Sequence, residues 1–178
     1  MTEQVTAYEK NDYVVHWSGK VCRVEDVSVL KMMEKEELYY TLSPLREERA
    51  RIYVPVRKGG ESLRPVMSKE EAICLIKELP DIEPLAIQDE RMRDKEYKSA
   101  FHTGDNRQRI KIVKELYQRK RRRLNAGKKP ASSDLETMSF VERSFEEEMA
   151  VALGIKNDEV RNVIADTLKL KEEYGSQE

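Results

Sequence analysis

The stretch DNRQRIKIVKELYQRKRRRL, residues 105–124, decides how the second half of this chain folds. Asp105 is the expected N-cap, and Gln108 three residues later completes a capping-box pattern. After this cap, apolar residues recur at the three- and four-residue spacing of one helix face. They are Ile110, Val113, Leu116, Tyr117 and Leu124. The sequence therefore predicts an amphipathic helix that packs on a core through this face.

The opposite face of the same helix is almost entirely basic. It includes Arg107, Arg109, Lys111 and Lys114, and it ends in five consecutive cations, Arg119, Lys120, Arg121, Arg122 and Arg123. Two interpretations fit this pattern. Cations near a helix C-terminus are stabilised by the negative pole of the helix dipole, as on an ordinary solvated helix. A cationic run of this density is also typical of a surface that binds polyanions.

The charge of the whole chain hides a strong asymmetry along it. The 178 residues have a net charge of −1, which by itself does not indicate binding to nucleic acid. The balance is −1 for residues 1–80, +7 for residues 81–130 and −7 for residues 131–178. No apolar run is long enough to cross a membrane, and the N-terminus lacks a signal-peptide pattern. We therefore expect a cytoplasmic protein with a basic middle segment, an acidic end and no membrane partner.

Residues 13–56 have the composition of short strands. The segments 13–17, 21–29, 38–42 and 51–56 are rich in β-branched and aromatic residues, and turn sequences separate them. Four strands in so short a stretch predict a small, strongly bent antiparallel sheet or barrel. The Gly59-Gly60 pair that follows lacks the spacing of a phosphate-binding loop and is expected to form a turn.

The periodicity then changes to that of helices. Ser68 and Glu71 form a capping box for a helix that Pro80 ends. We expect three further helices besides residues 105–124: one over residues 90–101, one from the Ser133 capping box to Gly154, and one that begins at Asn157.

These patterns together predict an α+β protein with two domains. A small, strongly bent antiparallel β-barrel with one terminal helix is expected over residues 1–82. An all-helical domain is expected over residues 83–178. The boundary is placed in the proline-containing segment that follows the first helix.

The sequence has none of the residue patterns that mark an active site. The two histidines, His16 and His102, lie in different predicted domains, and no His, Cys or carboxylate spacing fits zinc. Cys22 and Cys74 are far apart and are expected to be core thiols. We therefore expect no catalytic activity, no metal, no cofactor and no small-molecule substrate.

Several short motifs occur in a characteristic order. In the first half they are DYVV at 12–15, VEDV at 24–27, YVPV at 53–56 and LRPV at 63–66. Later ones are SKEEA at 68–72, TGD at 103–105, VKELYQRK at 113–120 and EMAVALG at 148–154. Their order and spacing, over roughly residues 10–165, resemble the CarD-like (CdnL) family of bacterial regulators of transcription initiation.

The resemblance implies a fold and two partners. It implies that the N-terminal barrel is a Tudor/SH3-like β-barrel that binds the β subunit of RNA polymerase. It also implies that the C-terminal helical domain contacts promoter DNA, so that the open complex is stabilised. We expect a monomer, associated with the nucleoid, in which a strand edge with Tyr39, Tyr40, Arg51 and Tyr53 contacts polymerase. The expected contacts to the DNA backbone are Arg91, Arg93, Lys95, Arg119, Lys120, Arg121, Arg122, Arg123, Lys128 and Lys129.

The chain departs from the family pattern at three places. Relatives usually carry a Trp before the TGD motif that wedges into the DNA minor groove; here Leu85 and Ile87 are the candidates for a smaller apolar wedge. The segment 133–136 replaces a Gly-Glu-Lys motif, and residues 17–20 replace a Pro-Gly-His-Gly turn. The alternative function is a protein-interaction adaptor whose basic helix face binds RNA or an acidic protein.

Overall fold

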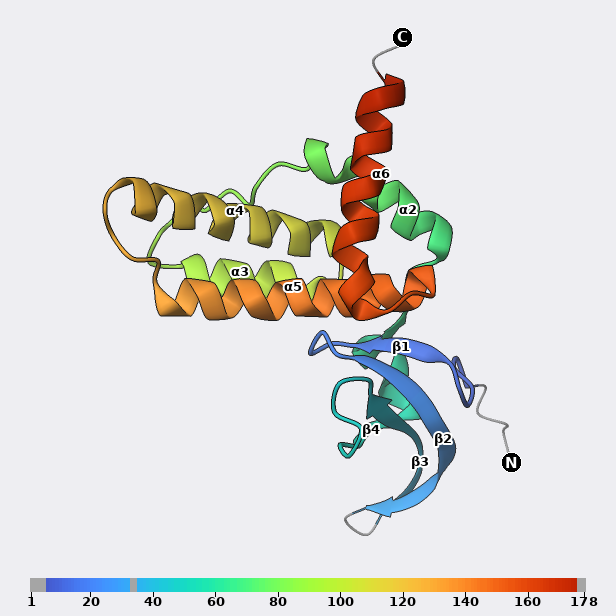
Figure 1. Cartoon of the computed structure of the whole chain (residues 1–178). Helices are drawn as coiled ribbons and strands as arrows, with labels where there is room; N and C mark the ends of the chain where they lie inside the picture. Colours follow the sequence, from blue (N-terminus) through green and yellow to red (C-terminus); the bar gives the residue numbers. More distant parts are fainter. Residues whose placement is uncertain (1–5, 33–34, 176–178) are drawn as a thin grey trace. The chain divides into compact units, whose positions relative to one another are not determined.

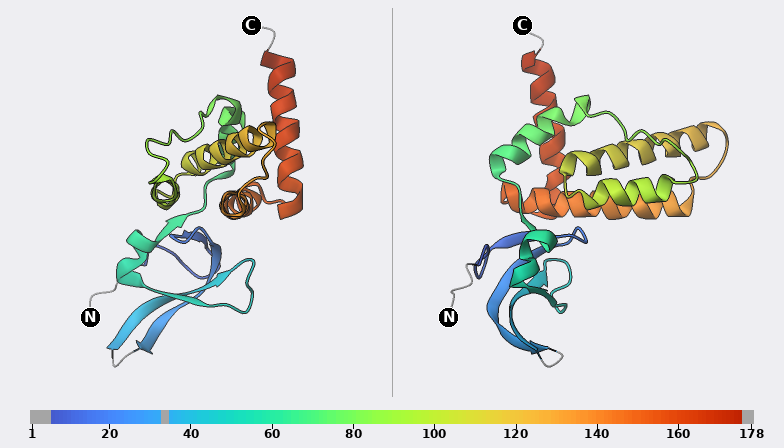
Figure 2. Two further views of the ribbon diagram at one scale, coloured as in Figure 1. Left: turned by 90° about the vertical axis from the view of Figure 1, so that its left-hand side faces the viewer. Right: turned by 180° about the vertical axis from the view of Figure 1, so that it is seen from behind.

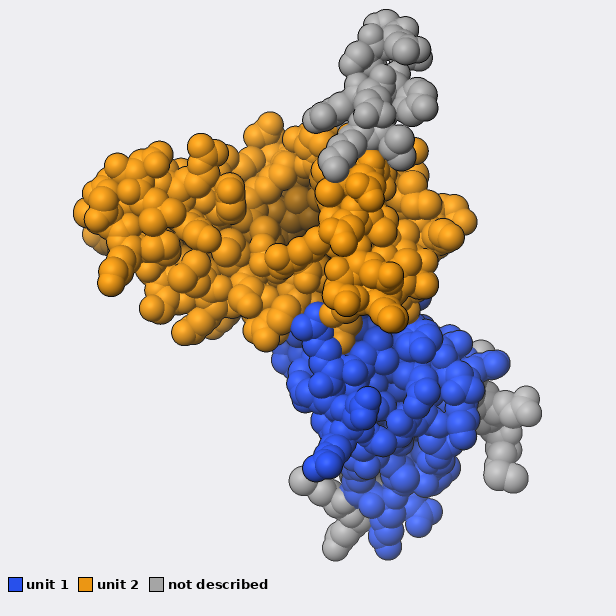
Figure 3. All heavy atoms as spheres, in the orientation of Figure 1, with its two compact units in different colours: residues 1–66 blue, residues 67–178 orange. Residues whose placement is uncertain are grey.

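A computed structural model of the chain describes residues 6–32 and 35–175 and forms two compact units (Figure 1). Unit 1 is Met1–Val66 and unit 2 is Met67–Glu178, coloured blue and orange in Figure 3. Unit 1 is an antiparallel sheet and unit 2 is helical, so the α+β fold class is confirmed. Among the helices of the described residues, none is long and apolar enough to span a membrane.

Unit 1 is a curled sheet of five antiparallel strands in the spatial order β4-β3-β2-β1-β5 (Figures 1 and 2). A β-bulge between Val24 and Asp26 increases the bend of the long β2–β3 hairpin. The short last strand was not expected from the sequence. The strands are β1 (Tyr13–His16), β2 (Val21–Met32), β3 (Lys35–Pro44), β4 (Ile52–Pro55) and β5 (Leu63–Pro65).

The concave side of this sheet is filled by one apolar cluster. Alternate residues of the strands face inward and are almost fully buried, as the two-residue period of a strand requires. The members are Val14, Cys22, Val24, Tyr40, Leu42, Val54 and Leu63.

The Gly59-Gly60 pair begins a helical turn rather than a simple reverse turn. A 3₁₀ turn, η1 (Val56–Lys58), leads into the short helix α1 (Gly59–Ser62). A Cβ atom on Gly59 would lie 2.9 Å from the Tyr40 ring, so the backbone packs directly on the core at this point.

Unit 2 is a helical unit in which α4 packs against both α3 and α5, while α6 packs against α2 and α5 (Figures 1 and 2). The 3₁₀ turns η2 (Leu79–Asp81) and η3 (Asn157–Glu159) follow α2 and precede α6. The helices are α2 (Lys69–Glu78), α3 (Arg93–His102), α4 (Asn106–Asn125), α5 (Ser132–Leu153) and α6 (Val160–Gly175).

The boundary between the units lies at residues 66 and 67, not at 82 and 83 as expected from the sequence. Helix α2 belongs to unit 2 because Ala72 and Ile76 are buried in one cluster with Phe145 and Met149 of α5. The capping box of Ser68 and Glu71 is confirmed, but Cys74 of the same helix is exposed, so the prediction of a core thiol there is wrong.

Helix α4 forms where predicted, and the Asp105 side chain caps it by accepting the N–H of Arg107. The predicted capping box with Gln108 is wrong, because the Asp105 N–H donates to Thr103 Oγ1 at 3.2 Å. Its buried face differs from the prediction. Tyr117 is 54 % exposed and Leu124 is also exposed, whereas Ile112 is fully buried. The reason is that α4 is covered by α3 and by the segment before it, where the Leu85 N–H donates to the Lys111 carbonyl at 3.0 Å.

The two ends of α5 agree with the sequence to different degrees. Its N-cap is Ala131, with no side-chain capping bond, so the Ser133 capping box is wrong. Its C-terminus is the predicted left-handed Gly154, with φ of 67°, and the Ile155 N–H returns to the Ala150 carbonyl at 3.0 Å.

Candidate functional site

The outer face of unit 1 presents tyrosines from two neighbouring strands. In the β3–β4 register, Thr41 lies opposite Tyr53 and Tyr39 lies opposite Pro55. Residues directly opposite one another in an antiparallel pair project from the same face. Tyr53 is 46 % exposed and Tyr39 is partly exposed. Two of the tyrosines that we predicted to contact a partner therefore share one accessible face.

Tyr40 lies on the other side of the sheet, and the prediction that it contacts a partner is corrected. Its ring is 1 % exposed and packs edge-on against Tyr8, with centroids 5.8 Å apart. Its hydroxyl accepts the Ala7 N–H at 3.0 Å. Consecutive strand residues point to opposite faces, so Tyr39 and Tyr40 cannot both be on the surface. Tyr40 is a core residue.

Arg51 is fixed beside these tyrosines. Its Nε lies 2.8 Å from Glu25 Oε2, and its Nη1 donates to the Glu48 carbonyl at 2.7 Å and the Ala50 carbonyl at 2.8 Å. The guanidinium therefore has a defined orientation at the start of β4. A groove of about 330 Å³ lies beside it and is lined by Tyr13, Arg23, Glu25, Ser43, Pro44, Leu45 and Glu48.

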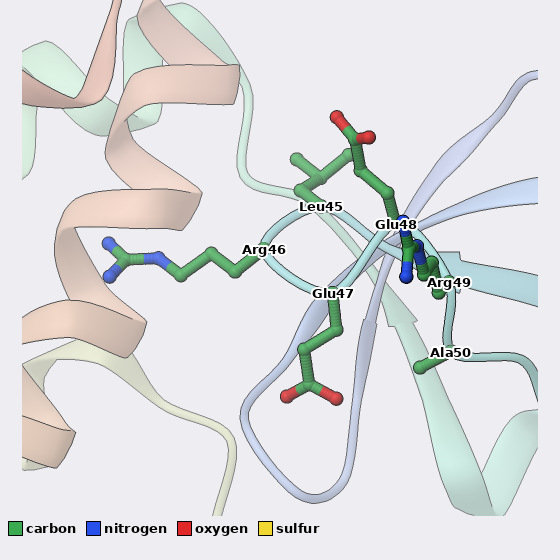
Figure 4. Close-up of a pocket in the computed structure, with 6 residues that line it drawn as sticks. All are labelled: Leu45, Arg46, Glu47, Glu48, Arg49 and Ala50. Carbon is green, nitrogen blue, oxygen red and sulfur yellow. The ribbon is translucent and has the colours of Figure 1, made fainter.

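The β3–β4 loop, residues 45–50, encloses a second shallow hollow of about 580 Å³ (Figure 4). Glu47 accepts a 2.7 Å hydrogen bond from Lys20 Nζ, which ties the loop to the β1–β2 turn. The side chains of Arg46 and Glu47 project away from the loop in Figure 4. The loop leads into β4, an edge strand, and edge strands present backbone groups to which another strand can pair.

The ten cationic residues that we predicted to contact the DNA backbone all lie in unit 2. The structure divides them into two groups, those with a partner inside the unit and those without one in the part of the unit that the structure describes. Four side chains are bound to other groups of the unit: Arg93, Arg119, Arg122 and Arg123. Arg122 pairs with Glu115 at 2.9 Å, and Arg123 donates to the Lys129 carbonyl at 2.8 Å. Among the described residues, no ion pair forms for the rest, which are Arg91, Lys95, Lys120, Arg121, Lys128 and Lys129.

Arg93 and Arg119 share ion pairs with Glu90 and Asp134, a set that we call the arginine–carboxylate quartet. Arg93 also pairs with the exposed Asp94, at 3.1 Å. Arg119 Nε lies 3.2 Å from Asp134 Oδ2, and its Nη1 lies 2.8 Å from Glu90 Oε1. Arg93 Nη2 lies 3.3 Å from Asp134 Oδ1, and its Nη1 lies 3.8 Å from Glu90 Oε2. Each carboxylate of the quartet therefore bridges both guanidiniums.

Arg109 was expected on the basic surface and is instead 1 % exposed. Its Nη1 lies 2.9 Å from Glu148 Oε2 and 2.9 Å from Asn106 Oδ1, and its guanidinium lies over the Phe101 ring at 5.0 Å. The other Glu148 oxygen accepts the Met67 N–H at 3.2 Å. A buried charge requires such partners, and the partner on α5 is 39 residues away in the sequence.

Leu85 and Ile87, the two candidates for a minor-groove wedge, contact the interior of unit 2. Both are partly buried and pack against a cluster formed by Tyr97, Ala100, Phe101, Ile112, Leu116 and Val141. Insertion into a DNA groove would remove these side chains from the cluster, so the wedge role stays a prediction that requires this packing to be given up.

The exposed face of α4 carries a pattern that the sequence analysis assigned to the core. Tyr117, Arg121 and Leu124 follow one another at helical spacing, and all three are exposed. Aromatic and cationic side chains together are typical of surfaces that contact nucleic acids or proteins. The cations on both sides of Tyr117 and Leu124 in the sequence were the available signal for this surface.

No group of three His, Cys, Asp or Glu side chains within the described ranges is placed to hold a metal ion. The described residues present an exposed edge strand and two accessible tyrosines in unit 1, and exposed cations in unit 2.

The comparisons with known proteins place unit 1 in a family. Residues 8–67 match the family model described as the CarD-like/TRCF RID domain. Residues 8–67 therefore form a domain of the CarD-like/TRCF RID kind, a regulatory, non-enzymatic kind of domain that binds RNA polymerase in transcription regulation. The match covers unit 1 and does not extend to helices α2–α6 of unit 2. A search of curated proteins found no significant match.

Proposed function

We propose that this chain regulates transcription initiation by binding the β subunit of RNA polymerase through unit 1 and promoter DNA through unit 2. The two contacts together stabilise the open complex. The chain acts as a monomer in the cytoplasm, at the nucleoid. The observation that carries the proposal is the agreement between the matched residues 8–67 and the compact sheet of unit 1.

The polymerase contact is assigned to β4 and the outer face next to it. Edge-strand pairing gives affinity through the backbone, and neighbouring side chains add specificity. Tyr39, Arg51 and Tyr53 are the side chains that this mode of binding uses. Arg51 is already oriented by Glu25, which limits the loss of side-chain entropy on binding.

The DNA contact is assigned to the cations of unit 2 that have no partner among the described residues. Arg121, Lys128 and Lys129 lie at the end of α4 and in the loop after it, and all are exposed. Contacts of this kind bind phosphates, so they position the chain without reading base sequence. Weak sequence preference and a steep dependence on salt follow.

One experiment with the full chain tests both assignments, because each variant serves as the control for the other. We expect Tyr53→Ala to weaken binding to RNA polymerase about tenfold and to leave binding to fork-junction DNA unchanged. We expect the double variant Arg121→Glu, Lys128→Glu to weaken DNA binding at least about tenfold, with a salt slope lower by about two. Interferometry for polymerase and fluorescence anisotropy for DNA measure the two affinities.

A charge-matched control is the double variant Lys69→Glu, Lys156→Glu, which reverses two exposed cations elsewhere in unit 2. DNA binding should change much less in this control than in the α4 variant. Equal losses would show that only total charge matters and would remove the assignment to α4 and its loop.

The adaptor alternative has one observation in its favour. Tyrosine and arginine dominate the energetics of protein interfaces, and Tyr117 and Arg121 are exposed together on α4. A salt titration against duplex, fork-junction and single-stranded DNA separates the two functions. No binding to any of these would favour an acidic protein partner.

A further inference from the structure

The arginine–carboxylate quartet has a buried side and an exposed side. Asp134 has a side-chain exposure of 7 %, and the side chains of Arg93 and Arg119 are 18 % and 17 % exposed. Glu90 is 65 % exposed. Two guanidiniums are thus held by a buried carboxylate, while an exposed carboxylate binds the same two guanidiniums from solvent.

Asp134 keeps the two arginines oriented without Glu90. Its two oxygens bind one guanidinium each, at 3.2 Å to Arg119 and 3.3 Å to Arg93. The pKa of Arg119 is raised: burial acts to lower it, but the hydrogen bond and charge of Asp134, with the charge of Glu90, outweigh burial. Arg119 therefore stays charged, and Asp134 holds both guanidiniums in place.

Glu90 is held much less firmly than Asp134. It lies in the irregular segment just before α3, and its partners are the two guanidiniums of the quartet. An exposed ion pair of this kind contributes little free energy, because water solvates the separated carboxylate well. Its departure leaves the Arg119 guanidinium paired with Asp134 alone, while Arg93 keeps Asp134 and the exposed Asp94, which lies 3.1 Å from its Nη2.

Tyr97 adds a further polar group next to the quartet. The Arg93 guanidinium lies over its ring at 5.9 Å. Its hydroxyl is buried and has no hydrogen-bond partner in the described part of the chain. Burial, with the charge of Glu115, raises its pKa to about 12, while Arg119 and Arg93 oppose that rise, so the hydroxyl keeps its proton at neutral pH.

We propose that Arg93 and Arg119 form a preformed site for a phosphate oxyanion, and that the Glu90 carboxylate occupies this site until a phosphodiester group of nucleic acid displaces it. Phosphate and carboxylate bind guanidinium through the same hydrogen-bond geometry, so the exchange needs no rearrangement of the arginines. Glu90 thereby lowers the affinity of the cationic surface for nucleic acid. The nucleic-acid part of this inference rests on the proposed function.

The test compares Glu90→Gln with Asp89→Asn in the full chain. Asp89 is the adjacent exposed carboxylate, and its hydrogen bond to the Arg91 N–H can be kept by asparagine. Both substitutions remove one negative charge from the same segment, but only Glu90 contacts the arginines. We expect Glu90→Gln to raise affinity for duplex DNA about threefold or more above Asp89→Asn, with a steeper salt dependence.

A double-mutant cycle identifies the arginine through which Glu90 acts. In an Arg119→Gln background the gain from Glu90→Gln should fall to that of Asp89→Asn. Equal gains for the Glu90 and Asp89 variants, or a gain that persists without Arg119, would overturn the proposal. The comparison of Glu90→Gln with Asp89→Asn keeps it testable if Arg119→Gln does not fold.

Inorganic phosphate separates this inference from the proposed function. Millimolar phosphate should raise the Tm of Glu90→Gln more than that of Asp89→Asn, whether or not DNA binds. That Tm result without DNA binding would retain the oxyanion site and reject the DNA-binding function. DNA binding that is the same in the two variants, with equal Tm shifts, would reject the oxyanion site and retain the function.

Discussion

The first and last turns of α4 carry the same residue type in opposite roles. Arg109, near the start, is buried and paired with Glu148, while Arg121, near the end, is exposed. Both lie in one basic stretch of sequence, and nothing local distinguishes them. The difference comes from the tertiary contacts of each turn. Ile110, in the first turns of α4, belongs to one buried cluster with residues of α2, α5 and α6, and no residue of the last turns of α4 belongs to that cluster. A basic helix can thus be part of a core at one end and a binding surface at the other.

Removing the partner of the buried arginine should have the largest effect. We expect Glu148→Gln to lower the free energy of unfolding by about 3–5 kcal/mol, because it leaves the Arg109 charge buried without a counter-ion. The measurement is urea denaturation followed by circular dichroism. Arg121→Ala is the matched control and should change the same quantity by less than about 0.5 kcal/mol. Similar losses of unfolding free energy in both variants would mean that the ion pair of Arg109 does not stabilise the fold more than the exposed Arg121 does.

A smaller effect is expected from two apolar residues of α4, one buried and one exposed. Ile112→Ala should cost about 2–4 kcal/mol of unfolding free energy, because the side chain is fully buried among Tyr97, Phe101 and Val141. Tyr117→Ala, five residues on, should cost far less because that ring is largely exposed. Thermal unfolding of the two variants measures both effects. If Tyr117→Ala lost more unfolding free energy than Ile112→Ala, the buried face of α4 would be the one predicted from periodicity.

The smallest expected effect concerns His16, a buried titratable residue of unit 1. Burial, with the charge of Lys20, lowers the pKa of His16. Its Nδ1 accepts from the Ser18 N–H at 3.3 Å and lies 2.7 Å from Ser18 Oγ, which fits a neutral ring. The unfolded chain binds a proton more readily than the folded one, so stability should fall as the pH drops below about 6.5. Above that pH His16 contributes no pH dependence.

The measurement for this effect is chemical denaturation of the wild type and of His16→Gln at pH 7.5 and pH 5. The wild type should lose more stability between the two pH values than the variant, because glutamine cannot titrate. An identical change in both proteins would mean that His16 has the same pKa in the folded and unfolded states.

The parts of the fold that were predictable depend on local chemistry. The helix cap at Ser68, the left-handed Gly154 and the start of α4 at Asp105 each depend on residues a few positions apart, and each is confirmed. The strand segments were found for the same reason, since β-branched and aromatic residues favour strands locally. The strand β5 was missed because three residues carry too little pattern.

The errors occurred where contacts between distant segments decide the outcome. Tyr40 is buried and Tyr39 is not because the register of β3 against β4 sets which face is inward. The boundary at 66 and 67 follows from the packing of α2 on α5 and α6.

The sequence by itself determined the fold class, the order of strands before helices, and the basic character of residues 81–130. These depend on composition and on periods of two and 3.6 residues, which are local properties of the chain. The tertiary structure alone decided which cations are surface groups and which are bound within unit 2. Glu148 pairs with Arg109, and Asp134 and Glu90 pair with Arg119, over separations of 39, 15 and 29 residues. Folding alone brings these partners together, and so it decides which cations are paired within unit 2.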